Sequence, residues 1–104
     1  MAKKQKKVVN LKQDMQKYLS RVSEEHIFWC HDGRILKDMK DLAEALATMS
    51  DETFAYHSNT EKKDFSNWVR DVIGDVKLAD DLGSALSRTQ AATIVASRIT
   101  TLAK

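Results

Sequence analysis

Apolar residues recur along most of this chain at the spacing of an α-helix. From about residue 9 to 22 they follow intervals of three and four, which places them on one stripe of a helix. The stripe consists of Val8, Leu11, Met15, Tyr18, Leu19 and Val22. Because an apolar stripe on a short helix needs another surface to cover it, we expect this helix to pack on the body of the protein or on a partner.

Residues 25 to 37 depart from the helical pattern. Two short apolar runs, at 27–30 and 35–36, flank the dipeptide Asp32-Gly33. Both central residues of a tight hairpin turn need positive φ, which Asp-Gly tolerates, so the pattern predicts a β-hairpin. In a strand, the side chains of His26, Phe28 and Cys30 alternate with those of Ile27, Trp29 and His31. One of these two sets is expected to face the core.

Capping residues divide the rest of the chain into short helices. We expect helices to begin after Asp38, Ser50, Asp64 and Asp75, and a last one to open at Ser87 or Thr89. The sequence has no proline, and two of its three glycines, Gly74 and Gly83, are expected to end helices. The last helix carries Ala91, Ala92, Val95, Ile99 and Leu102 on one side. Its several Ser and Thr residues weaken intrinsic helicity, so it depends on packing.

These elements predict an α+β fold that is mostly α-helical, with one β-hairpin packed against about four to six short helices. The chain has 104 residues, of which 42% are hydrophobic and 31% charged. A chain of this length forms one domain that buries roughly 65% of its unfolded surface. We therefore expect a basic arm with an amphipathic helix over residues 1–24 and a single globular domain over 25–104.

Positive charge is concentrated at the N-terminus. Residues 1–24 carry seven basic and two acidic side chains, whereas residues 25–104 carry ten basic and thirteen acidic ones. A basic arm attracts phosphate backbones through its summed charge, which predicts nucleic-acid contact without base readout. The candidate contacts are Lys3, Lys4, Lys6, Lys7 and Lys12. The alternative is that the arm is a solvated tail that keeps the protein soluble.

Composition also bears on where the protein works. No apolar run approaches the ~20 residues of a membrane span, and the charged N-terminus leads into no signal-peptide hydrophobic region. Cys30 is the single cysteine and cannot form an intrachain disulfide. We therefore expect a cytoplasmic protein with no membrane partner.

The residues that could support metal binding or catalysis are few. His26, Cys30, His31 and His57 are the only soft metal ligands, and they lack the paired spacing of zinc sites. Cys30 with His57 would be a nucleophile and base only if the fold brought them together with an orienting group. Phosphate-loop, dinucleotide-binding and serine-hydrolase motifs are absent. We expect no catalytic residue, no metal and no cofactor.

The segment from Tyr56 to Trp68 holds the candidate ligand or partner surface: Tyr56, His57, Asp64 and Trp68. In one interpretation, Asp64 caps a helix and accepts a hydrogen bond from His57, while Phe65 and Trp68 fill the core. In the other, His57, Asp64 and Trp68 converge on a ligand or peptide beside an aromatic wall. Replacing Asp64 by Ala distinguishes the two, because only the first interpretation expects a loss of stability.

An ordered set of residues across about 25–82 resembles an uncharacterised domain family of archaea and bacteria. The matching positions are Phe28-Trp29-Cys30, Asp32-Gly33-Arg34, Leu36, Met39, Leu42, Leu46, Phe54, Tyr56-His57, Asp64-Phe65, Trp68-Val69, Gly74-Asp75 and Leu78-Ala79. The family's hallmark is a Tyr-His pair followed by Asn-Asp-Phe-x-x-Trp, and Lys63 replaces the Asn here. Any binding role of that Asn in the family would be lost in this chain. The resemblance implies a fold unit and no reaction.

These observations favour a small non-enzymatic interaction module whose basic arm contacts nucleic acid or a ribonucleoprotein surface. The alternative is a protein-binding adaptor or regulatory domain in which the arm is only a solubility tail. A third possibility, from a different class, is a small hydrolase or ligand-binding domain that uses the His57 region. The first and last helices offer apolar stripes that could bind a protein partner or a second copy of the chain.

Overall fold

Helices make up most of the computed structural model, which describes residues 16–103. A helical turn at 16–19 and the 3-10 turn η1 (Glu24–His26) precede strands β1 (Phe28–Trp29) and β2 (Ile35–Leu36). Helices α3 (Met39–Thr48), α4 (Asp51–His57) and α5 (Asp64–Trp68) follow. The π-helical turn η2 (Val69–Ile73) leads to α6 (Val76–Gly83) and α7 (Arg88–Ala103). The predicted fold class, mostly helical α+β with one hairpin, is confirmed.

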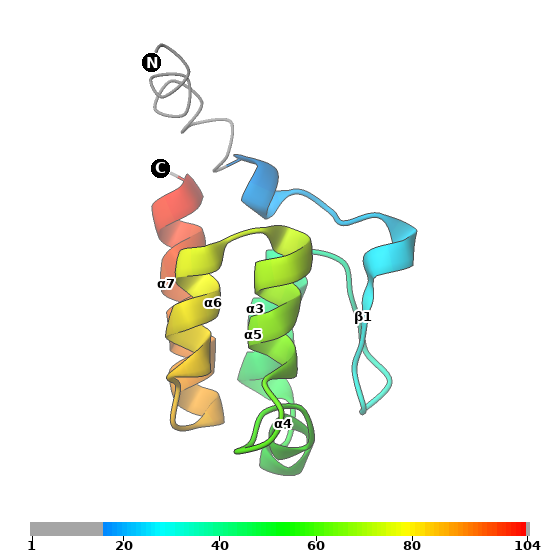
Figure 1. Cartoon of the computed structure of the whole chain (residues 1–104), viewed down its shortest axis with the longest axis vertical. Coiled ribbons are helices and arrows are strands. Elements are labelled where there is room, and N and C mark those ends of the chain that lie inside the picture. The colour runs from blue at the N-terminus through cyan, green and yellow to red at the C-terminus, as the bar shows by residue number, and fades with distance from the viewer. Residues whose placement is uncertain (1–15, 104) are drawn as a thin grey trace.

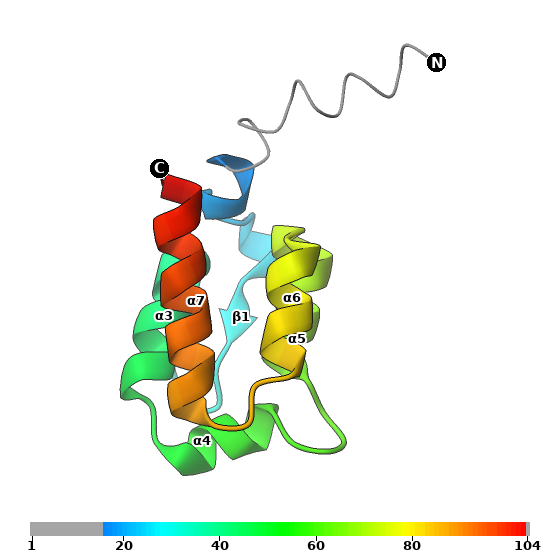
Figure 2. The ribbon, with the colours of Figure 1, turned by 90° about the vertical axis from the view of Figure 1, so that its left-hand side faces the viewer.

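The long helices lie side by side, and the hairpin stands along one edge of them (Figure 1). Helix α3 packs against α7, and α5 with η2 packs against α6 (Figure 2). Helix α4 closes the end of the helices where the hairpin has its tip. The turn at 16–19 lies at the opposite end, near the C-terminal end of α7. No helix in the described residues is long and apolar enough to cross a membrane.

Most helices begin where side-chain caps were predicted. Asp38 accepts a hydrogen bond from the Asp41 N–H, and Ser50 accepts one from the Thr53 N–H. Asp75 and Ser87 do the same for the N–H groups of Leu78 and Gln90. These bonds satisfy backbone donors that have no partner inside the helix. Three of the predicted caps are thereby confirmed, and Ser87 rather than Thr89 caps the last helix.

Two predicted helix boundaries are wrong. Lys63, and not Asp64, occupies the cap position of α5; it makes no side-chain cap bond, and Asp64 is the first helical residue. The carboxylate of Asp64 points instead to His57 and Lys62. The helix predicted over 9–22 has already ended after residue 19, because residues 20–23 are not helical. Its part before residue 16 lies outside the described residues.

The two glycines that were expected to end helices behave differently. Gly74 has a φ of 92°, so its left-handed conformation stops the segment formed by α5 and η2, as predicted. Its N–H donates to the carbonyl of Val69 at 2.7 Å, five residues back, which makes the last turn wide. Gly83 is the last residue of α6 but does not take positive φ.

The hairpin pairs Phe28 with Leu36 and Trp29 with Ile35 in antiparallel register. Phe28 packs against the core and Cys30 is buried, whereas Trp29 lies outside. The alternation therefore separates an inner set from an outer set, with His26 as an exception because it is exposed in η1. The hairpin is confirmed, but the predicted turn with positive φ at both central residues is wrong, because only Gly33 takes positive φ (96°) and Asp32 does not. The Gly33 N–H donates to the Cys30 carbonyl at 3.0 Å, which closes the turn.

The apolar stripe of the last helix is covered within the chain. Ala91, Val95 and Leu102 are buried, and α7 packs against α3 and α6. At the other end of the chain, Tyr18, Leu19 and Val22 pack partly buried against the same core. The lysines predicted to contact nucleic acid, Lys3 to Lys12, lie outside the described residues.

Candidate functional site

His57, the last residue of α4, links three elements through its imidazole ring. Its Nδ1 lies 3.0 Å from Oδ2 of Asp64, the first residue of α5. Its Nε2 accepts a hydrogen bond of 2.9 Å from the backbone N–H of His31 at the hairpin tip. Because Nε2 is an acceptor, the proton lies on Nδ1 and is donated to the carboxylate. The side chain of His57 therefore ties the hairpin to the α4–α5 connection.

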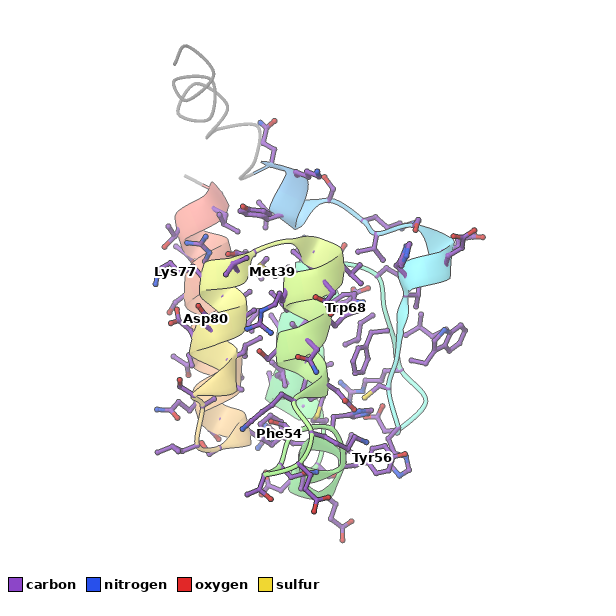
Figure 3. The ribbon with its side chains drawn as sticks, viewed as in Figure 1. Met39, Phe54, Tyr56, Trp68, Lys77 and Asp80 are labelled. Atoms are coloured by element: carbon purple, nitrogen blue, oxygen red, sulfur yellow. The ribbon has the colours of Figure 1, made fainter. Side chains whose placement is uncertain are left out.

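Aromatic rings surround this link on its inner side. The ring of Phe28 lies 5.0 Å from that of His57 and 5.1 Å from that of Phe65, between ring centres. Trp68 packs edge-on against Phe28 at 5.7 Å, and its indole N–H donates to the carbonyl of His26 at 2.8 Å. Figure 3 shows Trp68 on the side of α5 that faces the hairpin. These contacts hold β1 against α5.

The structure places all four predicted site residues around the rings of His57 and Phe28. His57 is only 5% exposed and Trp68 is buried, whereas Asp64, which pairs with His57, is partly exposed. Both nitrogens of His57 and the indole N–H of Trp68 already have partners in the chain. Tyr56 is 49% exposed, but its ring packs edge-on against that of His57, with ring centres 5.0 Å apart. The contacts that His57, Asp64 and Trp68 make within the chain are those of a structural link, and Tyr56 joins this link to the outside of the molecule.

Tyr56 is held between two neighbours on the outside of the molecule. Its ring stacks on the imidazole of His31, with ring centres 3.9 Å apart and planes inclined by 14°. The Lys62 ammonium lies 4.2 Å from the centre of the same ring, within the range of a cation–π interaction. Figure 3 shows Tyr56 at the end of the molecule where the hairpin has its tip.

Trp29 and Ile35 are exposed on the strands of the same hairpin that carries His31 at its tip. Trp29 is 69% exposed and pairs across the strands with Ile35, which is also exposed. We call this group the hairpin surface. It consists of Trp29, His31, Ile35, Tyr56 and Lys62. Of these five, only Tyr56 was among the predicted site residues. Strand alternation had placed Trp29 in one set with His31, but it did not say which set faces solvent.

The residues considered for metal binding or catalysis do not form a reactive group. Burial raises the pKa of the Cys30 thiol, which keeps it protonated at neutral pH. His57 has no free nitrogen with which to accept a proton from that thiol. Within residues 16–103, no three His, Cys, Asp or Glu side chains are placed to hold a metal ion.

A second polar feature lies between α6 and α7. Asp75 is 1% exposed, and both of its carboxylate oxygens accept bonds from Arg98, at 2.7 and 3.0 Å. These bonds hold the pKa of Arg98 above its usual value, although burial opposes the shift. A hollow of about 340 Å³ beside the pair is lined by Lys77, Asp81, Thr93, Ile94, Ser97, Arg98 and Thr101. Lys77 pairs with Asp81 there, so the hollow offers no uncompensated charge.

Comparison of the chain with protein-family models, with curated proteins and with solved structures finds no match in any of the three. The resemblance to the uncharacterised archaeal and bacterial family, seen over residues 25–82, thus stays a prediction.

Proposed function

We propose that this chain is a small non-enzymatic interaction domain that binds a protein partner through the hairpin surface. The observation that carries the proposal is the exposure of Trp29 opposite Ile35 in the hairpin register. Water covers both side chains in the free protein, and a partner that buried them would gain the hydrophobic free energy of an aromatic and a branched residue.

The type of residue supports this use of the surface. Trp and Tyr are enriched among the residues that contribute most of the binding energy at protein interfaces. Here one of each lies on the outside, joined by His31, which stacks on Tyr56 and follows Trp29 by two residues. Exposed apolar side chains that are neighbours across two strands, as Trp29 and Ile35 are, are typical of interaction sites.

The surface is also held in place before a partner arrives. The hairpin that carries Trp29 is fixed from behind by the bond from His31 to His57 and by the bond from Trp68 to His26. Tyr56 is fixed between His31 and Lys62. Because the hairpin backbone under Trp29 and the ring of Tyr56 lose little freedom on binding, more of the contact energy contributes to affinity.

The chemistry of the buried group supports a non-enzymatic role. A thiol nucleophile needs an available base, and the His57 nitrogens are both engaged in structural hydrogen bonds. The raised pKa of Cys30 works against thiolate formation as well.

The test is a selection of displayed random twelve-residue peptides on the immobilised full chain, followed by affinity measurements with synthetic peptides. We expect Trp29→Ala to weaken the selected peptides by at least about tenfold. Leu86→Ala is the matched control, because Leu86 is 90% exposed but lies between α6 and α7 and outside the hairpin surface. Equal affinities for the two variants would reject the hairpin surface as the binding site.

Nucleic-acid binding is a second candidate function, favoured by one observation: residues 1–24 carry a formal charge of +5, whereas residues 25–104 carry −3. In this proposal Lys3, Lys4, Lys6, Lys7 and Lys12 contact phosphates without reading bases. The test compares oligonucleotide binding by the full chain and by a variant with these five lysines changed to Gln, at two salt concentrations. We expect the Gln variant and high salt each to abolish binding. Absence of binding by the full chain at low salt would reject the proposal.

A further inference from the structure

We infer that the segment bound by the hairpin surface is positively charged, with a Lys or Arg side chain over the Trp29 indole and an apolar side chain against Ile35. This inference rests on the proposed function and names the chemistry of the partner. Three observations support it: the charge of the elements that carry the surface, the state of their basic side chains, and the contact already made by Tyr56.

Acidic residues prevail in the two segments that carry the hairpin surface. Residues 24–36 and 51–64 together hold three basic and seven acidic side chains, a formal charge of −4. The rest of the described chain holds eight basic and seven acidic ones, so its charge is +1. The negative charge of the described domain is therefore concentrated in the two segments that carry this surface. A field of that sign attracts basic segments and slows the approach of acidic ones.

Ion pairs engage three acidic and two basic side chains of these segments. Arg34 pairs with Asp32 at 3.1 Å, Lys62 with Asp64 at 3.4 Å, and Asp51 with Arg88 of α7 at 2.9 Å, which leaves four acidic side chains and one basic one. By contrast, Glu24 and Glu25, in the turn just before β1, are exposed and form no ion pair within residues 16–103. The charge left for a partner near Trp29 is thus negative.

Tyr56 shows within the chain the contact that we infer for Trp29. The Lys62 ammonium lies 4.2 Å from the centre of the Tyr56 ring. Indole has the strongest attraction for cations among the aromatic side chains. Trp29 is more exposed than Tyr56 and stacks on none of the aromatic rings in the described residues. A cation of the partner can therefore take the position over Trp29 that Lys62 takes over Tyr56.

The same charges disfavour a nucleic acid at this surface. Binding of single strands combines aromatic stacking with a basic groove that follows the phosphates. The hairpin surface has the aromatic side chains, but the elements around it are acidic, so phosphates would be repelled. We therefore infer a protein segment here, and treat an oligonucleotide as a competitor in the test.

The test starts from the tightest peptide selected on the full chain. We expect selected peptides to be richer in Lys and Arg than the unselected library. Changing the Lys and Arg residues of that peptide to Gln should weaken binding at least about tenfold, and raising the salt concentration should weaken the original peptide more than the Gln version. If the Gln version binds as tightly as the original, the inferred partner chemistry is wrong, while the surface itself stands.

Variants of the protein separate the cation contact from simple apolar burial. Trp29→Leu keeps an apolar side chain but removes the ring, so we expect the basic peptide to lose at least about fivefold in affinity and the Gln peptide much less. The double change of Glu24 and Glu25 to Gln should weaken the basic peptide by about threefold and leave the Gln peptide unchanged. Equal losses for both peptides in both variants would overturn the inference.

The outcomes distinguish the inference from the proposed function. Peptides that bind with no loss in Trp29→Ala would reject the proposed function and the inference together. Peptides that need Trp29 but not their own positive charge would reject the inference alone. Displacement of the basic peptide by a short oligonucleotide, with oligonucleotide binding lost in Trp29→Ala, would overturn the inference in favour of a nucleic-acid partner.

Discussion

The substitution Asp75→Asn tests whether the pair between α6 and α7 stabilises the fold. Asn has nearly the same shape as Asp, and its side-chain oxygen can still accept the bond from the Leu78 N–H that caps α6. What the substitution removes is the negative charge that faces Arg98. Asp75→Asn therefore removes the ion pair and keeps the helix cap, whereas Asp75→Ala would remove both.

The expected cost follows from the burial of the two partners. Removing one member of a buried ion pair costs about 3–5 kcal/mol, because the other charge stays behind without compensation. Asp75 is almost fully buried, but the Arg98 side chain keeps 20% of its surface exposed and can reach water. We therefore expect a loss of about 2–3 kcal/mol in the free energy of unfolding. For a domain of this size that corresponds to roughly 10–20 °C in Tm.

Urea unfolding followed by circular dichroism measures this loss. The matched control is Asp80→Asn, because Asp80 also pairs with an arginine, Arg70 at 3.0 Å, but on the exposed side of the molecule. Exposed pairs contribute about 0–1 kcal/mol, so this variant should stay close to the wild type. A double-mutant cycle with Arg98→Met isolates the pairwise energy. If Asp75→Asn costs no more than Asp80→Asn, the assignment of a stabilising buried pair is wrong.

Three further variants test other parts of the structure. Asp64→Ala leaves the Nδ1 proton of His57 without an acceptor, so we expect a loss of at least about 1 kcal/mol in urea unfolding; unchanged stability with lost peptide binding would instead support a ligand site. Gly74→Ala forces a left-handed conformation on Ala and should cost about 1 kcal/mol in the same assay, and a stable variant would contradict the observed φ. Because burial raises the pKa of Cys30, its protonated thiol stabilises the folded state below the unfolded pKa of about 8.5, and this contribution is lost as pH rises toward the folded pKa. When the pH rises from neutral to alkaline, the free energy of unfolding should therefore fall less in Cys30→Ala than in the wild type. Parallel plots of unfolding free energy against pH for the two proteins would refute this.

The parts of the fold that sequence could predict depend on local rules. Asp38, Ser50 and Asp75 cap helices because their oxygens reach an N–H three residues ahead, which is a matter of neighbouring positions only. The left-handed conformations of Gly33 and Gly74 are equally local. The hydrophobic pattern then fixed which side of each helix faces the core.

The errors arose where distant residues decide. Asp64 has the chemistry of a cap, but its carboxylate is drawn to His57 and Lys62, so it enters the helix instead. The wide turn of η2 has no local sequence signal. Strand alternation placed Trp29 and Phe28 on opposite sides, yet only the packing of Phe28 against Trp68, forty residues later, determines which one is outside.

The smallness of the hairpin has a consequence for how the protein folds. Two residue pairs are too few for a hairpin to be stable in water by itself. Its anchors, the bonds from Trp68 to His26 and from His31 to His57, join residues 42 and 26 positions apart, whereas α5, α6 and α7 are neighbours in sequence. Closing these long loops costs entropy that is recovered only after the helices have assembled. We therefore expect the hairpin to dock after the rate-limiting step, so that substitutions in it accelerate unfolding and leave the folding rate nearly unchanged.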